Sequence, residues 1–426
     1  MKKIVLITSL FLCLFVGIGF FIFGCDKTYK EKNVRCNENE CFDIMGVPIT
    51  GKVTFEKAEY IETNKYKNGY LISSYKKYTN QPSLYRGKKY SLEDMLDFNN
   101  ETEVSNEKFN KMKQVLDRNV EKFKAKNGSF IIMDISDSTI LSSYTSNDSS
   151  EDITFPWMNR LYESGSVLKI FNTAMALESK KYTINDKIDA KEPLKLKYNT
   201  VYDYRGENRE LTLEEILLYS SNIASAKMAL SIGGEYQYDF LKKLGLLNRI
   251  NDYGMKTQAP LYPAKNRWLA SDSSIATIAY GYGLSTTPLH LITAYSAIVN
   301  GGTYHKPSFE HFDNKEKVRV ISKENSKQMK EFLRSVVIKG SAKRANIDNI
   351  EIMGKTGTAN KLNEEGQYED KKVITTFIGN FEHNIKQYAI LVILDEPQPL
   401  EETYNFITSG WNAVPTAREI IENFVD

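Results

Sequence analysis

The stretch Tyr162-Glu-Ser-Gly-Ser-Val-Leu-Lys169 places a serine and a lysine three positions apart, at the start of an apolar segment that runs to Leu177. On a helix, side chains at this spacing share one face, so Lys169 is expected beside the Ser166 hydroxyl. A serine hydroxyl is a weak nucleophile until a neighbouring base takes its proton, and the lysine can supply that base. Free N–H groups at the helix start favour negative charge on the serine oxygen. The stretch predicts a nucleophilic serine.

Two later triplets, Ser220-Ser-Asn222 and Lys355-Thr-Gly-Thr358, would complete an acyl-transfer site. Each is weak evidence alone, because Ser and Asn also gather in turns and caps. Thr212-Leu-Glu-Glu215 is a capping box for a helix that ends before Ser220, so the second triplet falls on a connection between helices. Their joint occurrence in this order predicts a catalytic set and a substrate-binding set: Ser166, Lys169, Ser220 and Lys355, and Asn222, Thr356, Gly357 and Thr358.

Hydrophobic periodicity around these motifs predicts an α/β fold with a helical lobe beside a mostly antiparallel sheet. An amphipathic helix is expected to begin at Ser105 and to end at Gly128, and a closing helix over 415–424 is expected to pack on the sheet. The expected strands cover 129–134, 140–144, 352–358, 373–377 and 387–394, with a surface loop over 360–372.

The amino terminus predicts a membrane anchor. Met1-Lys-Lys3 precedes an uncharged apolar run over 4–24, which has about the twenty residues that a spanning helix needs. Lysines before the run predict a cytoplasmic tip at residues 1–3 and the rest of the chain outside the cytoplasmic membrane. A cleaved signal peptide would need small residues at a cleavage site, which the bulky 20–23 stretch lacks. The alternative is a lipoprotein box with lipidation of Cys25.

Residues 25–104 are rich in Lys, Tyr, Asn and Glu, with short alternating stretches that predict a small strand-rich module or a partly ordered stalk. Within it, Cys36 and Cys41 are close enough to form a small disulfide loop in an oxidising compartment. The catalytic domain is expected over 105–426.

Composition excludes several classes of function. The chain of 426 residues has 56 basic and 54 acidic residues, and this balance argues against a nucleic-acid partner. Its four histidines and four cysteines show no metal-ligand spacing, so no metal site is predicted.

The motifs resemble those of the class B penicillin-binding proteins, the membrane-anchored peptidoglycan transpeptidases. Beyond the three triplets, Ala279–His290 followed by Ala297–Gly302 is similar to the G-x-G-x-x-x-T-P-x-Q and N-G-G segment of that family, with His290 where Gln is usual. Asn159–Lys169 and Ser409–Pro415 are similar to the division-specific branch. The region before 105 is much shorter than the family's pedestal domain.

The resemblance implies a mechanism for these positions. Ser166 would attack the penultimate D-alanine carbonyl of a stem peptide with Lys169 as base, and Lys355 would lower the pKa of that lysine. Ser220 would pass a proton to the departing D-alanine, and Asn222 would bind the acyl amide. Thr356 and Thr358 would bind the terminal carboxylate, and the backbone N–H groups of Ser166 and Thr358 would form the oxyanion hole. No cofactor is implied. The implied partners are stem peptides, β-lactam antibiotics, the inner membrane and a glycan polymerase of the division or elongation machinery.

Two other functions remain open at this point. A β-lactamase or D,D-carboxypeptidase would use the same serine chemistry with water as the acceptor. A non-catalytic β-lactam sensor or division scaffold would only bind in the pocket.

Overall fold

The computed structural model describes residues 104–146, 155–253, 255–312, 315–363 and 365–426, together with the backbone of eight short strands between residues 28 and 90. The main domain is built on a five-stranded sheet of order β10-β9-β21-β20-β19, in which every neighbouring pair is antiparallel. Its strands are β9 (Asn127–Asp134), β10 (Thr139–Ser146), β19 (Ile352–Leu362), β20 (Tyr368–His383) and β21 (Lys386–Asp395). The predicted sheet is confirmed.

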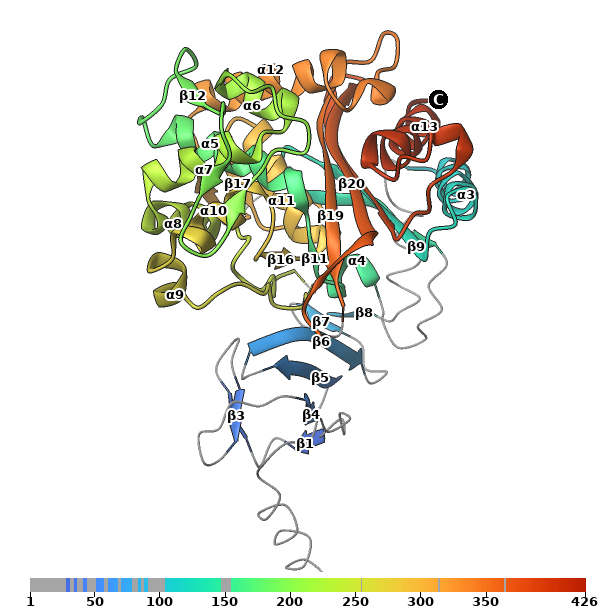
Figure 1. Ribbon diagram of the computed structural model, residues 1–426. Helices are drawn as coiled ribbons and strands as arrows, with labels where there is room; N and C mark the ends of the chain where they lie inside the picture. Colours follow the sequence, from blue (N-terminus) through green and yellow to red (C-terminus); the bar gives the residue numbers. More distant parts are fainter. Residues whose placement is uncertain are drawn as a thin grey trace, which may run out of the picture.

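Amphipathic helices cover both faces of this sheet. Helices α3 (Asn106–Lys122) and α13 (Ala413–Val425) pack on each other and on one face, whereas α11 (Pro288–Val299) and α12 (Lys323–Lys339) pack on the other (Figure 1). Two interior strands are the most buried: β9 is buried at every position and β21 at eight of its ten, as expected for strands covered on both faces. The core therefore lies in two layers on either side of the sheet.

The helical lobe lies beside β19, on the side of α11 and α12 (Figure 1). Its helices are α4 (Pro156–Asn159), α5 (Leu168–Glu178), α6 (Leu213–Tyr219), α7 (Asn222–Ile232), α8 (Gly234–Lys243), α9 (Lys265–Leu269) and α10 (Asp272–Tyr280). Short strand pairs link them: β11 (Tyr162–Glu163) with β16 (Ser285–Thr286), β12 (Lys187–Asp189) with β15 (Glu210–Thr212), β13 (Leu194–Lys195) with β14 (Thr200–Val201), and β17 (Thr303–His305) with β18 (Lys317–Arg319). The 3₁₀ turns are η3 (Gly165–Val167), η4 (Lys343–Ala345), η5 (Glu401–Thr403) and η6 (Ser409–Trp411).

Two expected boundaries were wrong. The first helix ends at Lys122, and Gly128 lies in β9 instead of ending the helix. A Cβ at Gly128 would lie 2.7 Å from a methyl group of Val120, so the glycine lets α3 pack closely on the strand. The predicted loop over 360–372 is shorter, because β19 continues to Leu362 and β20 begins at Tyr368.

The amino-terminal region contains strands, as predicted. A four-stranded sheet of order β1-β4-β5-β6 is formed by β1 (Thr28–Lys30), β4 (Gly51–Glu56), β5 (Tyr60–Lys67) and β6 (Tyr70–Tyr78). Two hairpins are formed by β2 (Val34–Cys36) with β3 (Cys41–Asp43), and by β7 (Ser83–Tyr85) with β8 (Lys88–Tyr90). Cys36 and Cys41 are register partners in the first hairpin, and their disulfide stays a prediction.

The predicted anchor at 4–24 and the alternative of lipidation at Cys25 lie outside the described residues. Within the described part of the chain, no helix combines the length and apolar character needed to cross a bilayer.

Candidate active site

The nucleophile candidate lies where η3 leads into α5. Ser166 is half-buried in the 3₁₀ turn, and Lys169 follows in the first turn of the helix with its side chain fully buried. The Nζ atom of Lys169 lies 2.7 Å from Ser166 Oγ and 2.7 Å from Asn222 Oδ1. The predicted contact between a serine and a lysine three positions apart is therefore present.

The second triplet lies between α6 and α7. The capping box of Thr212 and Glu215 starts α6, as predicted, and Ser220 ends it in a left-handed conformation with φ of +59°. A non-glycine residue rarely adopts this conformation, and such strain clusters at functional sites. Ser220 Oγ accepts hydrogen bonds from Lys169 Nζ at 3.4 Å and from Lys355 Nζ at 3.2 Å. The hydroxyl thus lies between the two lysines.

The third triplet lies on β19, the edge strand that faces the helical lobe. Lys355 is fully buried and donates to Ser220 Oγ and to the carbonyl oxygen of Thr356, at 3.1 Å. Burial lowers the pKa of Lys355 to about 7. Burial also lowers the pKa of Lys169 well below its usual range, and the positive charge of Lys355 lowers it further, while Asp203 opposes the shift. Burial in this pocket therefore favours the neutral, basic form of both lysines.

Glycines allow the three segments to meet. A Cβ at Gly357 would lie 2.4 Å from the carbonyl oxygen of Ser164, so only glycine lets β19 approach the turn that carries Ser166. On the other side of this turn, a Cβ at Gly281 would lie 1.8 Å from the carbonyl oxygen of Gly165, and Gly281 also has a φ of +116°. The turn is held between β19 and the glycine-rich segment that follows α10.

The two threonines of the triplet are held by two serines that are not among the predicted site residues. Thr356 Oγ1 shares a hydrogen bond of 2.6 Å with Ser341 Oγ, and Thr358 Oγ1 accepts the backbone N–H of Ser409 at 3.2 Å. Ser409 belongs to the segment over 409–415 that the sequence marked as division-specific. That segment therefore orients a residue of the site.

Asp203 is a further residue that sequence reasoning missed. Its carboxylate accepts the backbone N–H groups of Asn222 and Ile223, at 2.5 and 3.0 Å, and the hydroxyl of Ser221 at 2.8 Å. The preceding carbonyl, that of Tyr202, accepts Asn222 Nδ2 at 2.9 Å. Together these bonds orient the amide of Asn222 toward Lys169. No local pattern marks this aspartate, because its partners lie 18 to 20 positions away.

Glu163 was also missed, although it lies three positions before Ser166. Its carboxylate accepts the backbone N–H of Gly283 at 2.5 Å and the hydroxyl of Tyr368 at 3.0 Å. Burial raises the pKa of Glu163 to about 7, because these neutral donors only partly replace water. The residue joins the start of β20 to the glycine-rich segment beside the serine.

His290 supports that segment from inside the core. It is buried, with Nδ1 2.6 Å from Thr287 Oγ1 and Nε2 2.9 Å from the carbonyl oxygen of Asn248. Burial lowers its pKa to about 4, so the ring is neutral at physiological pH. These contacts require a proton on Nε2 and none on Nδ1. Replacement of the family's usual Gln by His thus leaves a neutral hydrogen-bonding group here.

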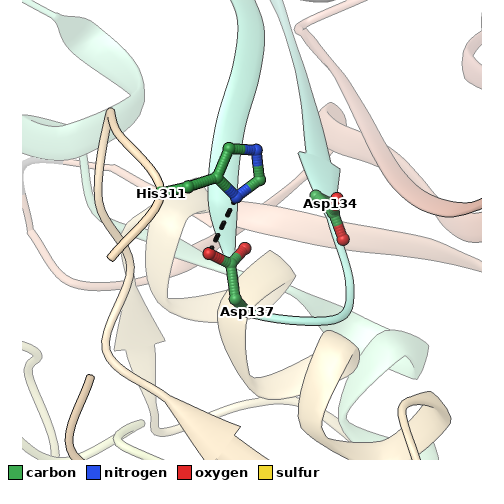
Figure 2. A group of neighbouring side chains, drawn as sticks. All are labelled: Asp134, Asp137 and His311. Atoms are coloured by element: carbon green, nitrogen blue, oxygen red, sulfur yellow. Dashed lines mark hydrogen bonds and ion pairs between the residues drawn. The ribbon is translucent and has the colours of Figure 1, made fainter. Parts of the chain in front are cut away.

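A group of potential metal ligands lies elsewhere among the described residues. Asp134, Asp137 and His311 bring one ligand atom each within 4.8 Å of one another, and His311 Nδ1 lies 3.0 Å from Asp137 Oδ2 (Figure 2). The ammonium group of the buried Lys315 lies 3.2 Å from the same Asp137 oxygen, and Asp134 accepts two hydrogen bonds from Ser136. A protein cation therefore already neutralises Asp137, and this cluster contains none of the predicted site residues.

Comparison with known proteins agrees with this geometry. The family model for the penicillin binding protein transpeptidase domain matches residues 128–422. The "Probable peptidoglycan D,D-transpeptidase FtsI" of Caulobacter vibrioides is 31% identical over 273 residues, which cover 62% of this chain and 46% of that protein. The "Probable peptidoglycan D,D-transpeptidase PenA" of Neisseria flavescens is 30% identical over 317 residues, which cover 72% of this chain and 77% of that protein.

A solved structure is also similar. The transpeptidase domain of Burkholderia pseudomallei penicillin-binding protein 3 superposes with a TM-score of 0.66 at 25% identity, over 74% of this chain and 92% of that one. The chain spans about half the length of the first curated relatives that it matches. The predicted resemblance and fold are confirmed: the chain belongs to the penicillin-binding protein transpeptidase family, in its class B, division-type branch.

Proposed function

We propose that this protein is a serine-type D-Ala-D-Ala transpeptidase that cross-links peptidoglycan stem peptides during septal wall synthesis. The observation that carries the proposal is the 2.7 Å contact between Ser166 Oγ and a fully buried Lys169 whose pKa is depressed. The relatives from Caulobacter vibrioides and Neisseria flavescens, both named as probable peptidoglycan D,D-transpeptidases, support the same reaction. A buried lysine without a carboxylate in hydrogen-bonding contact lowers stability, so an inert scaffold would gain nothing from it.

In the proposed acylation step, neutral Lys169 takes the hydroxyl proton of Ser166 as the oxygen attacks the penultimate D-alanine carbonyl. The tetrahedral oxyanion forms beside the backbone N–H groups of Ser166 and Thr358, and each donor of this kind contributes about 3 kcal/mol. The bond to the terminal D-alanine nitrogen then breaks, and the proton from Lys169 reaches that nitrogen through Ser220 Oγ. The products are a Ser166 ester and free D-alanine.

The remaining site residues bind the donor peptide. Asn222 binds the acyl amide, and the hydroxyls of Thr356 and Thr358 bind the terminal carboxylate, while Gly357 keeps β19 close to the serine. An amine from a neighbouring stem peptide next attacks the ester carbonyl. This step forms the cross-link and restores the Ser166 hydroxyl. β-Lactams acylate Ser166 because their strained amide resembles the D-alanyl-D-alanine bond.

We place the protein in the bacterial cytoplasmic membrane, with a single span at 4–24 and the catalytic domain on the outer side. The apolar run after Lys2 and Lys3 supports this orientation. As the resemblance to the class B family implies, a glycan polymerase of the division machinery is the proposed partner.

The test uses a donor peptide that ends in D-alanyl-D-alanine and an acceptor peptide with a free amine. We expect release of D-alanine matched by formation of the cross-linked dimer, and loss of both in Ser166→Ala. Hydrolysed donor as the dominant product would show a carboxypeptidase instead. Rapid turnover of a penicillin, in place of a long-lived adduct, would show a β-lactamase.

A further inference from the structure

A groove of about 920 Å³ lies outside the candidate active site. It is lined by α12, by the ends of β9 and α11, and by the turn that joins β20 to β21. None of the predicted site residues lines it. Its volume falls in the range of sites that bind ligands or peptide segments.

The wall formed by α12 carries a stripe of four cations: Lys323, Lys327, Lys330 and Arg334. Their positions i, i+4, i+7 and i+11 place all four on one face of the helix. Like charges at this spacing repel one another and destabilise a helix. Within the described part of the chain, none of the four forms an ion pair: Lys330 donates to the side chain of Gln387, and Arg334 to the carbonyl of Ile352 and the side chain of Asn346.

The other charged lining residues leave an excess of positive charge. Lys386 adds a fifth cation, against the three carboxylates of Asp134, Glu331 and Glu351. Asp134 already accepts Ser136, and Glu331 accepts the side-chain amide of Gln328. The whole chain carries a formal net charge of only +2, so this is a local concentration of charge.

An independent observation comes from the turn at the rim of the groove. Ile385 is 95% exposed and has a φ of +69°, and Asn384 before it has a φ of +49°. A β-branched residue is a steric outlier in this conformation, and an Asn-Gly pair would form the same hairpin turn without strain. Folding therefore gains neither burial nor favourable backbone conformation from this isoleucine. Strain of this kind marks functional positions.

We propose that this groove docks an acidic segment of a partner protein, whose carboxylates pair with the α12 stripe and whose apolar side chain packs on Ile385. Charge complementarity selects an acidic partner, and the exposed isoleucine at the rim selects one with an apolar anchor. The concave shape favours a peptide segment over a flat lipid surface. The inference does not depend on the transpeptidase reaction.

The test measures binding of a fluorescein-labelled, 16-residue peptide of Glu and Leu, with Leu at helical spacing, to the full-length chain in detergent. Fluorescence anisotropy should show saturable binding that weakens at least tenfold in the double variant Lys323→Glu/Lys327→Glu. The matched control is Lys242→Glu/Lys243→Glu, which reverses two exposed lysines at the end of α8 and should change the affinity less than twofold. Acylation by penicillin should be equal in all variants, which controls for folding.

Ile385→Gly separates docking from a structural role. We expect binding at least threefold weaker but a Tm about 2 °C or more higher, because glycine relieves the strained turn. A lower Tm would show that Ile385 stabilises the fold and would overturn the proposal. Absence of binding, equal binding of a Glu and Ser peptide, or equal weakening by the α8 variant would also overturn it. Tighter binding to phosphatidylglycerol vesicles than to the peptide would favour a membrane surface instead.

Discussion

Replacement of Asp203 by alanine tests how the site is held together. The carboxylate is the shared acceptor of two backbone N–H groups at the start of α7 and of the Ser221 hydroxyl. Ser221 keeps its own bond to the N–H of Ala224 in the variant, so the loss falls mainly on the N–H groups of Asn222 and Ile223. Asn222 Oδ1 contacts Lys169 and would lose its orientation.

The size of the effect follows from these bonds. Each lost bond to a half-buried carboxylate costs about 1 kcal/mol after water replaces part of it, so the variant should lose about 2 kcal/mol. That corresponds to a fall in Tm of about 3 °C for a domain of about 320 residues, because the entropy of unfolding is about 2 cal/mol/K per residue. A shift of about 1 Å at Asn222 and Ser220 should slow acylation about 100-fold.

Stopped-flow acylation by a fluorescent penicillin, measured from pH 5 to 9, separates the two roles of this residue. The charge of Asp203 raises the pKa of Lys169, so Asp203→Ala should also move the rising limb of the rate to lower pH. Asp203→Asn keeps an acceptor for the N–H groups but removes the charge. The Tm of Asp203→Asn should therefore fall less than that of Asp203→Ala. The rising limb of its acylation rate should shift to lower pH by the same amount as in Asp203→Ala. Wild-type rates in Asp203→Ala would refute this reasoning.

Three further predictions concern the lysines and the close approach of β19. Lys169→Arg should slow acylation about 10³-fold while the fold is retained, because a guanidinium group cannot act as a base. A rate within tenfold of wild type in the penicillin assay would contradict this prediction. The depressed pKa of Lys355 makes unfolding take up a proton between about pH 7 and the unfolded value near 10.4, so stability should rise with pH in this window. Denaturant titrations should show a smaller rise in Lys355→Met than in wild type, and an unchanged slope would contradict the assigned pKa. Gly357→Ala should lower the free energy of unfolding by about 1 to 3 kcal/mol and slow acylation, because the new Cβ would lie 2.4 Å from the Ser164 carbonyl oxygen. A Tm and an acylation rate equal to those of wild type would show that β19 can move away from the turn.

The features that the sequence predicted correctly were local or repeated. Periodicity and cap chemistry predicted the amphipathic helix α3, the capping box of Thr212 and the sheet strands, and the structure contains all of them. Short motifs also predicted that three distant segments meet, and the contacts of Lys169 and Lys355 link these segments. The catalytic and binding roles of the eight residues stay predictions.

The features that the sequence did not predict depend on tertiary packing. Gly128 has the pattern of a helix terminator, but the close packing of Val120 against the strand determines its place in β9. Asp203 and Ser341 act through partners brought near by the fold, so no spacing could mark them. The strain at Ile385 is a property of its backbone, which composition cannot reveal.

The most direct test of the central claim is intact mass spectrometry after incubation with a penicillin, followed by mapping of the modified peptide. Convergence of the three segments at one activated hydroxyl predicts a single adduct on Ser166, absent in Ser166→Ala and formed much more slowly in Lys169→Arg. An unmodified Ser166, or an adduct that persists in Ser166→Ala, would contradict the account.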